Sequence, residues 1–179
     1  MARLPYVPQD LAEPRGIVDA IRARRGGALL NLDRILLHSP PVAAGWTTML
    51  GSIRKDLALS PKLRELAMCV VAVLNGAEYE WGHHAPLFVA AGGTEAQLAA
   101  MRDPEAASRN AVLFDAAERA ALALTVEMTR TVRVAEATFD AVKAALPDPR
   151  QAFELVVTIA AYNMVSRVLV AVGVEPEGH

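Results

Sequence analysis

The stretch that decides the fold of this chain is SPKLRELAMCVVAVLNGAEYEWGHHAPLFVAAGG, residues 60–93. Ser60 is a good N-cap and Pro61 suits the first helical position, where a missing N–H costs nothing. Taken alone, the apolar run at residues 67–74 would also fit a buried strand. The cap, the total length and the Asn75-Gly76 stop signal favour a buried helix instead.

A second helix is expected directly after this turn. It carries Glu78 to His84 and ends at Gly92-Gly93. Thr94 then begins another helix, because Gln97 follows it at the spacing of a capping box. The stretch therefore predicts two consecutive helices that turn back on each other.

Three titratable residues of this stretch are candidates for one site. Glu80 and His84 are four residues apart, so they share one face of the second helix. Antiparallel packing of the two helices would bring Glu65 towards that face. Two carboxylates and an imidazole in an apolar shell would perturb one another's pKa values, as general acid–base catalysis requires.

These residues also have a plain structural interpretation. Glu80 and His84 could form an exposed helix pair worth about 0.3 kcal/mol. Glu65 could be an early-turn carboxylate that the helix dipole favours. Burial of the three side chains would separate the two interpretations.

Composition limits what the chain can be. It has 179 residues, 53% of them hydrophobic and 5% aromatic, which suffices for one sizeable core. This apolar fraction exceeds that of an average soluble domain and indicates a homo-oligomer with an apolar interface. A net charge of −2 without a basic block argues against nucleic acid as a partner.

Targeting signals and cysteines give two further expectations. No run reaches the roughly 18 uncharged apolar residues that span a membrane, and the N-terminus has no apolar signal core. We therefore predict a cytoplasmic protein with no membrane partner. Cys69 is the only cysteine, so neither an intrachain disulfide nor a thiolate metal cluster is expected.

The remaining pattern predicts an all-α, single-domain helical bundle. Residues 1–14 read as an extended arm, because Pro5, Pro8 and Pro14 interrupt any helix. The arm could pack on a neighbouring subunit or remain solvated. One helical domain follows at residues 15–179, and no alternating strand pattern is present.

Within this domain, the predicted helices outside the central stretch lie at residues 15–25, 28–38, 40–57, 111–130, 135–146 and 150–172, with a polar loop at 103–110. Val112, Leu113, Ala116, Ala120 and Leu124 are expected to face inward. The last helix is apolar nearly all round, which predicts burial in the core or against another subunit.

The central stretch resembles a known superfamily. Glu65, Ala77, Glu80 and His84 stand at the spacing E-x11-A-x2-E-x3-H. This spacing resembles the alkylhydroperoxidase D / carboxymuconolactone decarboxylase superfamily, whose peroxidase branch has E-x11-C-x2-C-x3-H. The turn at Asn75, the AEYEW segment and the AAGGTEAQLAAM continuation are similar to the decarboxylase-like branch.

This resemblance implies a cofactor-free lyase with an alkylhydroperoxidase D-like fold. Its decarboxylase branch removes CO2 from γ-carboxymuconolactone in aromatic compound catabolism. His84 would donate the proton. Glu80 would tune and orient the His84 side chain, and Glu65 would relay protons. A small lactone or carboxylic acid would be the substrate. Members of the superfamily form dimers, trimers and hexamers.

The chain departs from the peroxidase branch at both cysteines. Ala77 and Glu80 occupy their positions, so no thiol pair is available to attack peroxide and resolve the product. Two alternatives stay open. One is a peroxide-detoxifying protein that uses Cys69, and the other is a non-catalytic helical oligomer that binds a small molecule.

Other residues of the stretch are candidates for contact with the substrate. Tyr79, Trp81 and His83 lie on other faces of the second helix, where they would form a pocket wall or an interface. An anionic substrate needs a cation, and the sequence offers four candidates, which are Arg34, His38, Arg64 and Arg167.

A metal site is not expected. Glu80-x-x-His83 matches half of a carboxylate-bridged di-iron motif, but no second Glu-x-x-His exists in the sequence. A mononuclear site built from Glu65, Glu80, His83 or His84 remains an alternative.

Overall fold

The computed structural model describes residues 2–178, and the predictions for Met1 and His179 lie outside this range. The described part is helical without a strand, so the all-α prediction is confirmed. Its helices are α1 (Arg15–Arg25), α2 (Asn31–Leu36), α3 (Pro40–Lys55), α4 (Pro61–Asn75), α5 (Glu78–Ala90), α6 (Glu95–Ala100), α7 (Pro104–Ala107), α8 (Ala116–Arg130), α9 (Glu136–Ala145) and α10 (Pro149–Val172).

Local sequence signals place the ends of the central helices. The Ser60 hydroxyl accepts a hydrogen bond from the Leu63 N–H, as an N-cap does. Gly76 ends α4 with a φ of 66°, in the left-handed region that favours glycine. The predicted capping box of Thr94 and Gln97 is present at the start of α6.

The segment before α8 differs from the prediction. Val112 is 93% exposed rather than inward-facing, and α8 begins only at Ala116. The reason is a capping box in which Asp115 and Glu118 bond each other's backbone N–H, which sets the helix start there. The predicted loop at 103–110 also contains the single turn of α7, which begins at Pro104.

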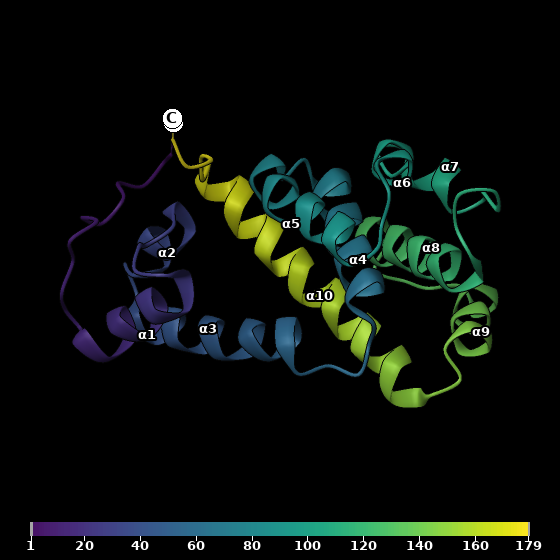
Figure 1. Cartoon of the computed structure of the whole chain (residues 1–179), viewed down its shortest axis with the longest axis horizontal. Helices are drawn as coiled ribbons and strands as arrows, with labels where there is room; N and C mark the ends of the chain where they lie inside the picture. Colours follow the sequence, from purple (N-terminus) through teal and green to yellow (C-terminus); the bar gives the residue numbers. More distant parts are fainter. Residues whose placement is uncertain (1, 179) are drawn as a thin grey trace. The chain divides into compact units, whose positions relative to one another are not determined.

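The chain forms two compact units. The first comprises residues 2–56 together with 171–178, and the second comprises residues 57–170. In the first unit, α3 packs against α1 and α2 (Figure 1).

The N-terminal arm is extended and packs on its own chain. The Arg3 N–H donates to the carbonyl of Val172 over 2.7 Å. Arg34 donates through Nε to the Val7 carbonyl, also over 2.7 Å, and its guanidinium lies 4.9 Å from the centre of the Tyr6 ring. These contacts bind the arm to α2 and to the end of α10.

The second unit is built around α4. Every residue from Leu63 to Ala72 is buried, and α4 packs against both α5 and α8 (Figure 1). Helix α9 packs in turn on α8. The apolar run that the sequence left open between strand and helix is therefore a core helix.

Buried polar groups connect the helices of this unit. Glu118 of α8 accepts hydrogen bonds from Gln97 over 3.1 Å and from the Asp115 N–H over 2.9 Å, and it pairs with Lys62 Nζ at 2.6 Å. These contacts tie α8 to α6 and to the start of α4. Glu118 is only 3% exposed, so the charge is buried with its partners.

A second polar cluster joins α10 to the ends of α4 and α8. Asn163 of α10 donates to the Thr129 hydroxyl over 2.9 Å and accepts from the Asn75 amide over 3.1 Å. The same Asn75 amide also donates to Ser166 over 2.6 Å. Because these bonds need matched positions on three helices, they set where α10 lies along the unit.

Helix α10 is partly buried within the single chain, and burial of the rest against another subunit stays a prediction. By length and composition it could cross a membrane, but about half of its apolar window is buried in the structure. Phe153 is 67% exposed, whereas Tyr162 is fully buried. A core helix passes the same test, so this feature is weak evidence for a membrane, and the cytoplasmic location stays a prediction.

The chain after α5 makes a close approach at Gly93. Its N–H donates to the Phe88 carbonyl over 2.9 Å, and a Cβ added at this glycine would overlap the Phe88 ring. Phe88 is fully buried, so its ring has no room to move aside.

We predict that Gly93→Ala lowers the free energy of unfolding by about 1–3 kcal/mol, because the new methyl group overpacks the core at Phe88. Gly82→Ala is the matched control within α5, since a Cβ there meets nothing within 4 Å. This control should raise stability by about 0.5–1 kcal/mol. Urea denaturation followed by circular dichroism measures both, and equal effects of the two substitutions would contradict the prediction.

Candidate functional site

The candidate site is centred on a side-chain hydrogen bond between α4 and α5. Nδ1 of His84 lies 2.6 Å from Oε2 of Glu65. An ionised carboxylate can only accept, so Nδ1 carries the hydrogen and donates it. The structure therefore brings together two of the three residues that the spacing predicted.

Both partners are buried. Glu65 is 5% exposed and His84 is 6% exposed, and Glu80 on the same face of α5 is 2% exposed. The interpretation of Glu80 and His84 as a solvated helix pair is therefore wrong. A charge-assisted hydrogen bond is stronger away from water, so the Glu65 carboxylate holds the imidazole in one orientation.

Tyr162 of α10 completes the surroundings of His84. The two rings meet edge to face, with centroids 4.9 Å apart. Sequence reasoning did not find Tyr162, because nothing near it in sequence marks a site. The available signal was a tyrosine in a long apolar helix, since a buried hydroxyl usually needs a partner.

Cys69 lies close to the same carboxylates. It is fully buried on α4, four residues after Glu65. Burial raises the pKa of the Cys69 thiol well above its ordinary value, and the charges of Glu65 and Glu80 raise it further. The environment thus disfavours the thiolate, which is the form that attacks peroxide.

Tyr79 and His83 lie one against the other on α5. Their rings stack with centroids 4.4 Å apart, and His83 Nδ1 is 2.8 Å from the Tyr79 carbonyl oxygen. Tyr79 is buried and His83 is half-buried. No contact in the described residues 2–178 shows these two side chains binding a substrate, so that role stays a prediction.

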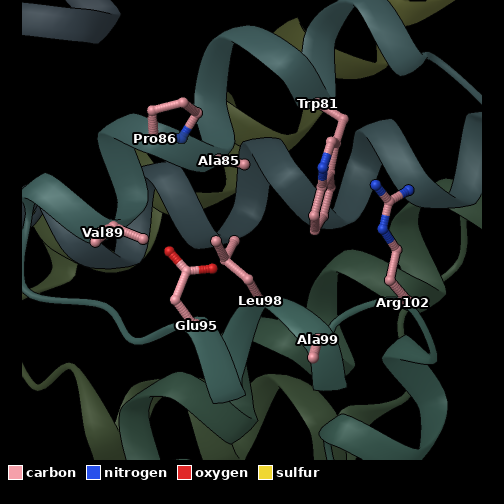
Figure 2. Close-up of a pocket in the computed structure, with 8 residues that line it drawn as sticks. All are labelled: Trp81, Ala85, Pro86, Val89, Glu95, Leu98, Ala99 and Arg102. Carbon is pink, nitrogen blue, oxygen red and sulfur yellow. The ribbon is translucent and has the colours of Figure 1, made fainter.

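Trp81 lines a separate cavity of about 600 Å³ between α5 and α6. Figure 2 shows its walls, with Ala85, Val89 and Leu98 forming the apolar part. The Arg102 guanidinium lies 3.7 Å from the centre of the Trp81 ring and pairs with Glu78 at 3.1 Å. Glu65, Glu80 and His84 are not among the residues that line this cavity.

The four candidate cations differ in what already binds them. In the first unit, Arg34 donates to the Val7 carbonyl, and His38 Nε2 lies 2.6 Å from the carbonyl oxygen of Pro5. Arg167 is exposed and donates to the Asn163 carbonyl over 2.8 Å. Arg64 is buried beside Glu65, with Nε 3.9 Å from Oε1.

Metal ligands do not converge in the described part of the chain. Within residues 2–178, no group of three or more His, Cys, Asp or Glu side chains is placed to hold a metal ion. The contact of Glu65 with His84 uses Nδ1, and the described residues give that pair no third ligand.

Solved structures of other proteins share the fold of this chain. A peroxidase-related protein from Silicibacter sp. TM1040 superimposes with a TM-score of 0.82 at 18% identity, over 99% of this chain and 92% of that one. An alkylhydroperoxidase AhpD core protein from Ralstonia eutropha JMP134 gives 0.80 at 20% identity, over 99% and 93%. A cysteine-to-alanine variant of the debrominase Bmp8, in complex with 2,3,4-tribromopyrrole, gives 0.78 at 16% identity, over 99% and 95%. The fold is therefore alkylhydroperoxidase D-like.

The sequence match agrees with the fold. The model of the carboxymuconolactone decarboxylase family matches residues 40–127, a segment that includes Glu65, Glu80 and His84. No curated protein matches the chain at a significant level. The match over residues 40–127 and the fold together support the alkylhydroperoxidase D / carboxymuconolactone decarboxylase superfamily.

We predict that the Cys69 thiol of the native protein resists alkylation, because it is buried and its pKa is raised. Iodoacetamide at mildly alkaline pH should leave the folded chain unlabelled and should label it fully in guanidinium chloride. Intact-mass spectrometry reads one site without ambiguity, since the sequence has one cysteine. Rapid labelling of the folded protein would contradict this prediction.

Proposed function

We propose that this protein is a carboxymuconolactone decarboxylase-like lyase that works without a cofactor by general acid–base chemistry. The observation that carries the proposal is the 2.6 Å hydrogen bond from His84 Nδ1 to Glu65 inside a buried shell. Such a bond fixes the tautomer and the direction of the imidazole ring, which proton transfer to a substrate requires.

In this proposal His84 carries the proton. With Nδ1 committed to Glu65, exchange with a substrate falls to Nε2, the opposite nitrogen of the ring. When the ring takes a proton, the adjacent carboxylate stabilises the imidazolium, and when it gives the proton away the hydrogen bond keeps the ring aligned. Glu65 is thus a positioning residue for His84.

Glu80 would adjust the charge at this site. It lies on the same face of α5 as His84, and its charge reaches the cluster, since it contributes to the raised pKa of the Cys69 thiol. A second buried carboxylate favours the protonated form of a nearby imidazole. The two carboxylates would therefore favour an imidazole that can donate a proton to the substrate carbon.

The substrate class follows from the chemistry of decarboxylation. Loss of CO2 leaves an electron pair, which an adjacent unsaturated carbonyl can absorb before the carbon takes a proton from His84. A small unsaturated lactone that bears a carboxylate meets both conditions. The bromopyrrole bound to the debrominase Bmp8 supports a compact ring as the kind of ligand that this fold accepts.

Two other functions have less support. A peroxidase would need a thiolate, and burial and neighbouring carboxylates oppose one at Cys69. A purely ligand-binding role would not require the His84 imidazole to be held in one orientation.

We predict that the protein releases CO2 from γ-carboxymuconolactone and that His84→Ala lowers kcat by about 100-fold or more, the usual contribution of a general acid. Glu65→Gln should lower kcat with little change in KM, because it removes the charge that orients the ring. A coupled CO2 assay measures both variants.

Glu136→Gln is the control for charge, since Glu136 is exposed in the first turn of α9. It should leave turnover unchanged. Unaltered turnover in both His84→Ala and Glu65→Gln, with helix content preserved, would refute the acid–base proposal.

We also propose that the protein is a homo-oligomer. Large apolar side chains remain exposed in the second unit, among them Phe153 at 67% and Leu87 at 50%. Burying such surface between subunits is favourable. Light scattering at micromolar concentration should give a mass of a dimer, trimer or hexamer, and a monomer would refute the proposal.

A further inference from the structure

Arg64 is a buried cation with few partners. The residue is 8% exposed and its side chain 10% exposed. Its Nε is buried and makes no hydrogen bond within residues 2–178. The carboxylate contact that the side chain makes there is with Glu65 Oε1, at 3.9 Å, which is longer than a hydrogen bond.

This arrangement is costly unless an anion completes it. A guanidinium carries five N–H donors in a planar fork, and a buried charge is normally paired and hydrogen-bonded. Asp33 of the first unit is a buried charge that meets this rule. It is 1% exposed and bonds both Arg25, at 3.0 Å, and the Leu30 N–H, at 3.1 Å. Within residues 2–178, Arg64 Nε is therefore a buried donor without an acceptor.

Arg64 lies beside the carboxylate of Glu65. One oxygen of that group accepts the hydrogen bond from His84, and the other faces Arg64 Nε. The imidazole and the guanidinium thus lie on the two sides of a single carboxylate. An anion bound to Arg64 would place its neighbouring atoms beside the imidazole.

We propose that Arg64 binds a carboxylate of the substrate and makes the site specific for small anionic ring compounds over their neutral analogues. The proposal rests on the function proposed for His84 and Glu65. Guanidinium and carboxylate match as a two-pronged pair, which gives geometric selection as well as attraction. The cation also offsets the charges of Glu65 and Glu80, which would otherwise repel an acidic ligand.

The competing interpretation is that Arg64 only positions Glu65. In that case its loss would disturb the pair with His84 and weaken every ligand equally. A specificity role predicts a loss confined to anionic ligands. A matched pair of ligands that differ only in charge separates the two.

The experiment uses γ-carboxy-γ-butyrolactone and its methyl ester as probes, titrated by calorimetry into the full chain at fixed ionic strength. The wild-type protein should bind the acid at least about tenfold more tightly than the ester, as expected for hydrogen bonds to a charged group. Arg64→Gln should abolish this preference, because it weakens the binding of the acid and leaves the binding of the ester unchanged. Arg64→Lys should restore part of the preference for the acid, because lysine returns the positive charge but lacks the planar set of guanidinium donors.

Arg109→Gln is the matched control, because it removes the same charge from an exposed position. It should keep the wild-type preference. Helix content and melting temperature verify that each variant is folded, and Arg64→Lys carries the test if Arg64→Gln does not fold.

Three results would overturn the proposal. These are no saturable binding of the acid to the wild-type protein, an unchanged preference in Arg64→Gln, and equal weakening of acid and ester. Binding is measured without turnover. A protein that prefers the acid through Arg64 but releases no CO2 therefore sustains this inference while removing the decarboxylase function.

Discussion

The hydrogen bond between His84 and Glu65 is the interaction on which the candidate site depends. Its 2.6 Å length requires α4 and α5 to pack at one relative position, because each partner is buried on the face that meets the other helix. The turn at Gly76 and the close approach at Gly93 hold α5 in that position from both ends. The dyad is thus a product of backbone geometry as much as of side-chain chemistry.

Burial of hydrogen-bonded polar and charged groups is the common feature of the second unit. Glu118 is satisfied by Lys62 and Gln97, and Asn163 is satisfied by partners on α4 and α8. Each of these groups binds one helix to another, so the polar contacts specify how the helices pack. Arg64 differs, because within residues 2–178 its Nε makes no hydrogen bond and lies 3.9 Å from Glu65 Oε1.

Local signals in the sequence were enough to predict the helical fold and the contact between Glu65 and His84. The cap at Ser60, the turn at Asn75-Gly76 and the spacing of Glu80 and His84 are all read within one or two helical turns. They predicted the helix pair, and antiparallel packing of that pair predicted that Glu65 approaches the face that carries His84. The contact of Tyr162 with His84 joins residues 78 positions apart (162 − 84), so no local pattern could reveal it. The late start of α8 was missed because the capping box at Asp115 competes with the apolar pattern that begins at Val112.

The dyad is built from a single helical hairpin, whereas its surroundings come from distant parts of the chain. About twenty residues, from Glu65 to His84, hold both proton-handling groups. Helix α10 supplies Tyr162 independently of that hairpin. Substitutions in α10 can therefore change the surroundings of the site without disrupting the contact between Glu65 and His84. Proteins that share this fold at less than 21% identity, such as those compared above, can differ in chemistry for that reason.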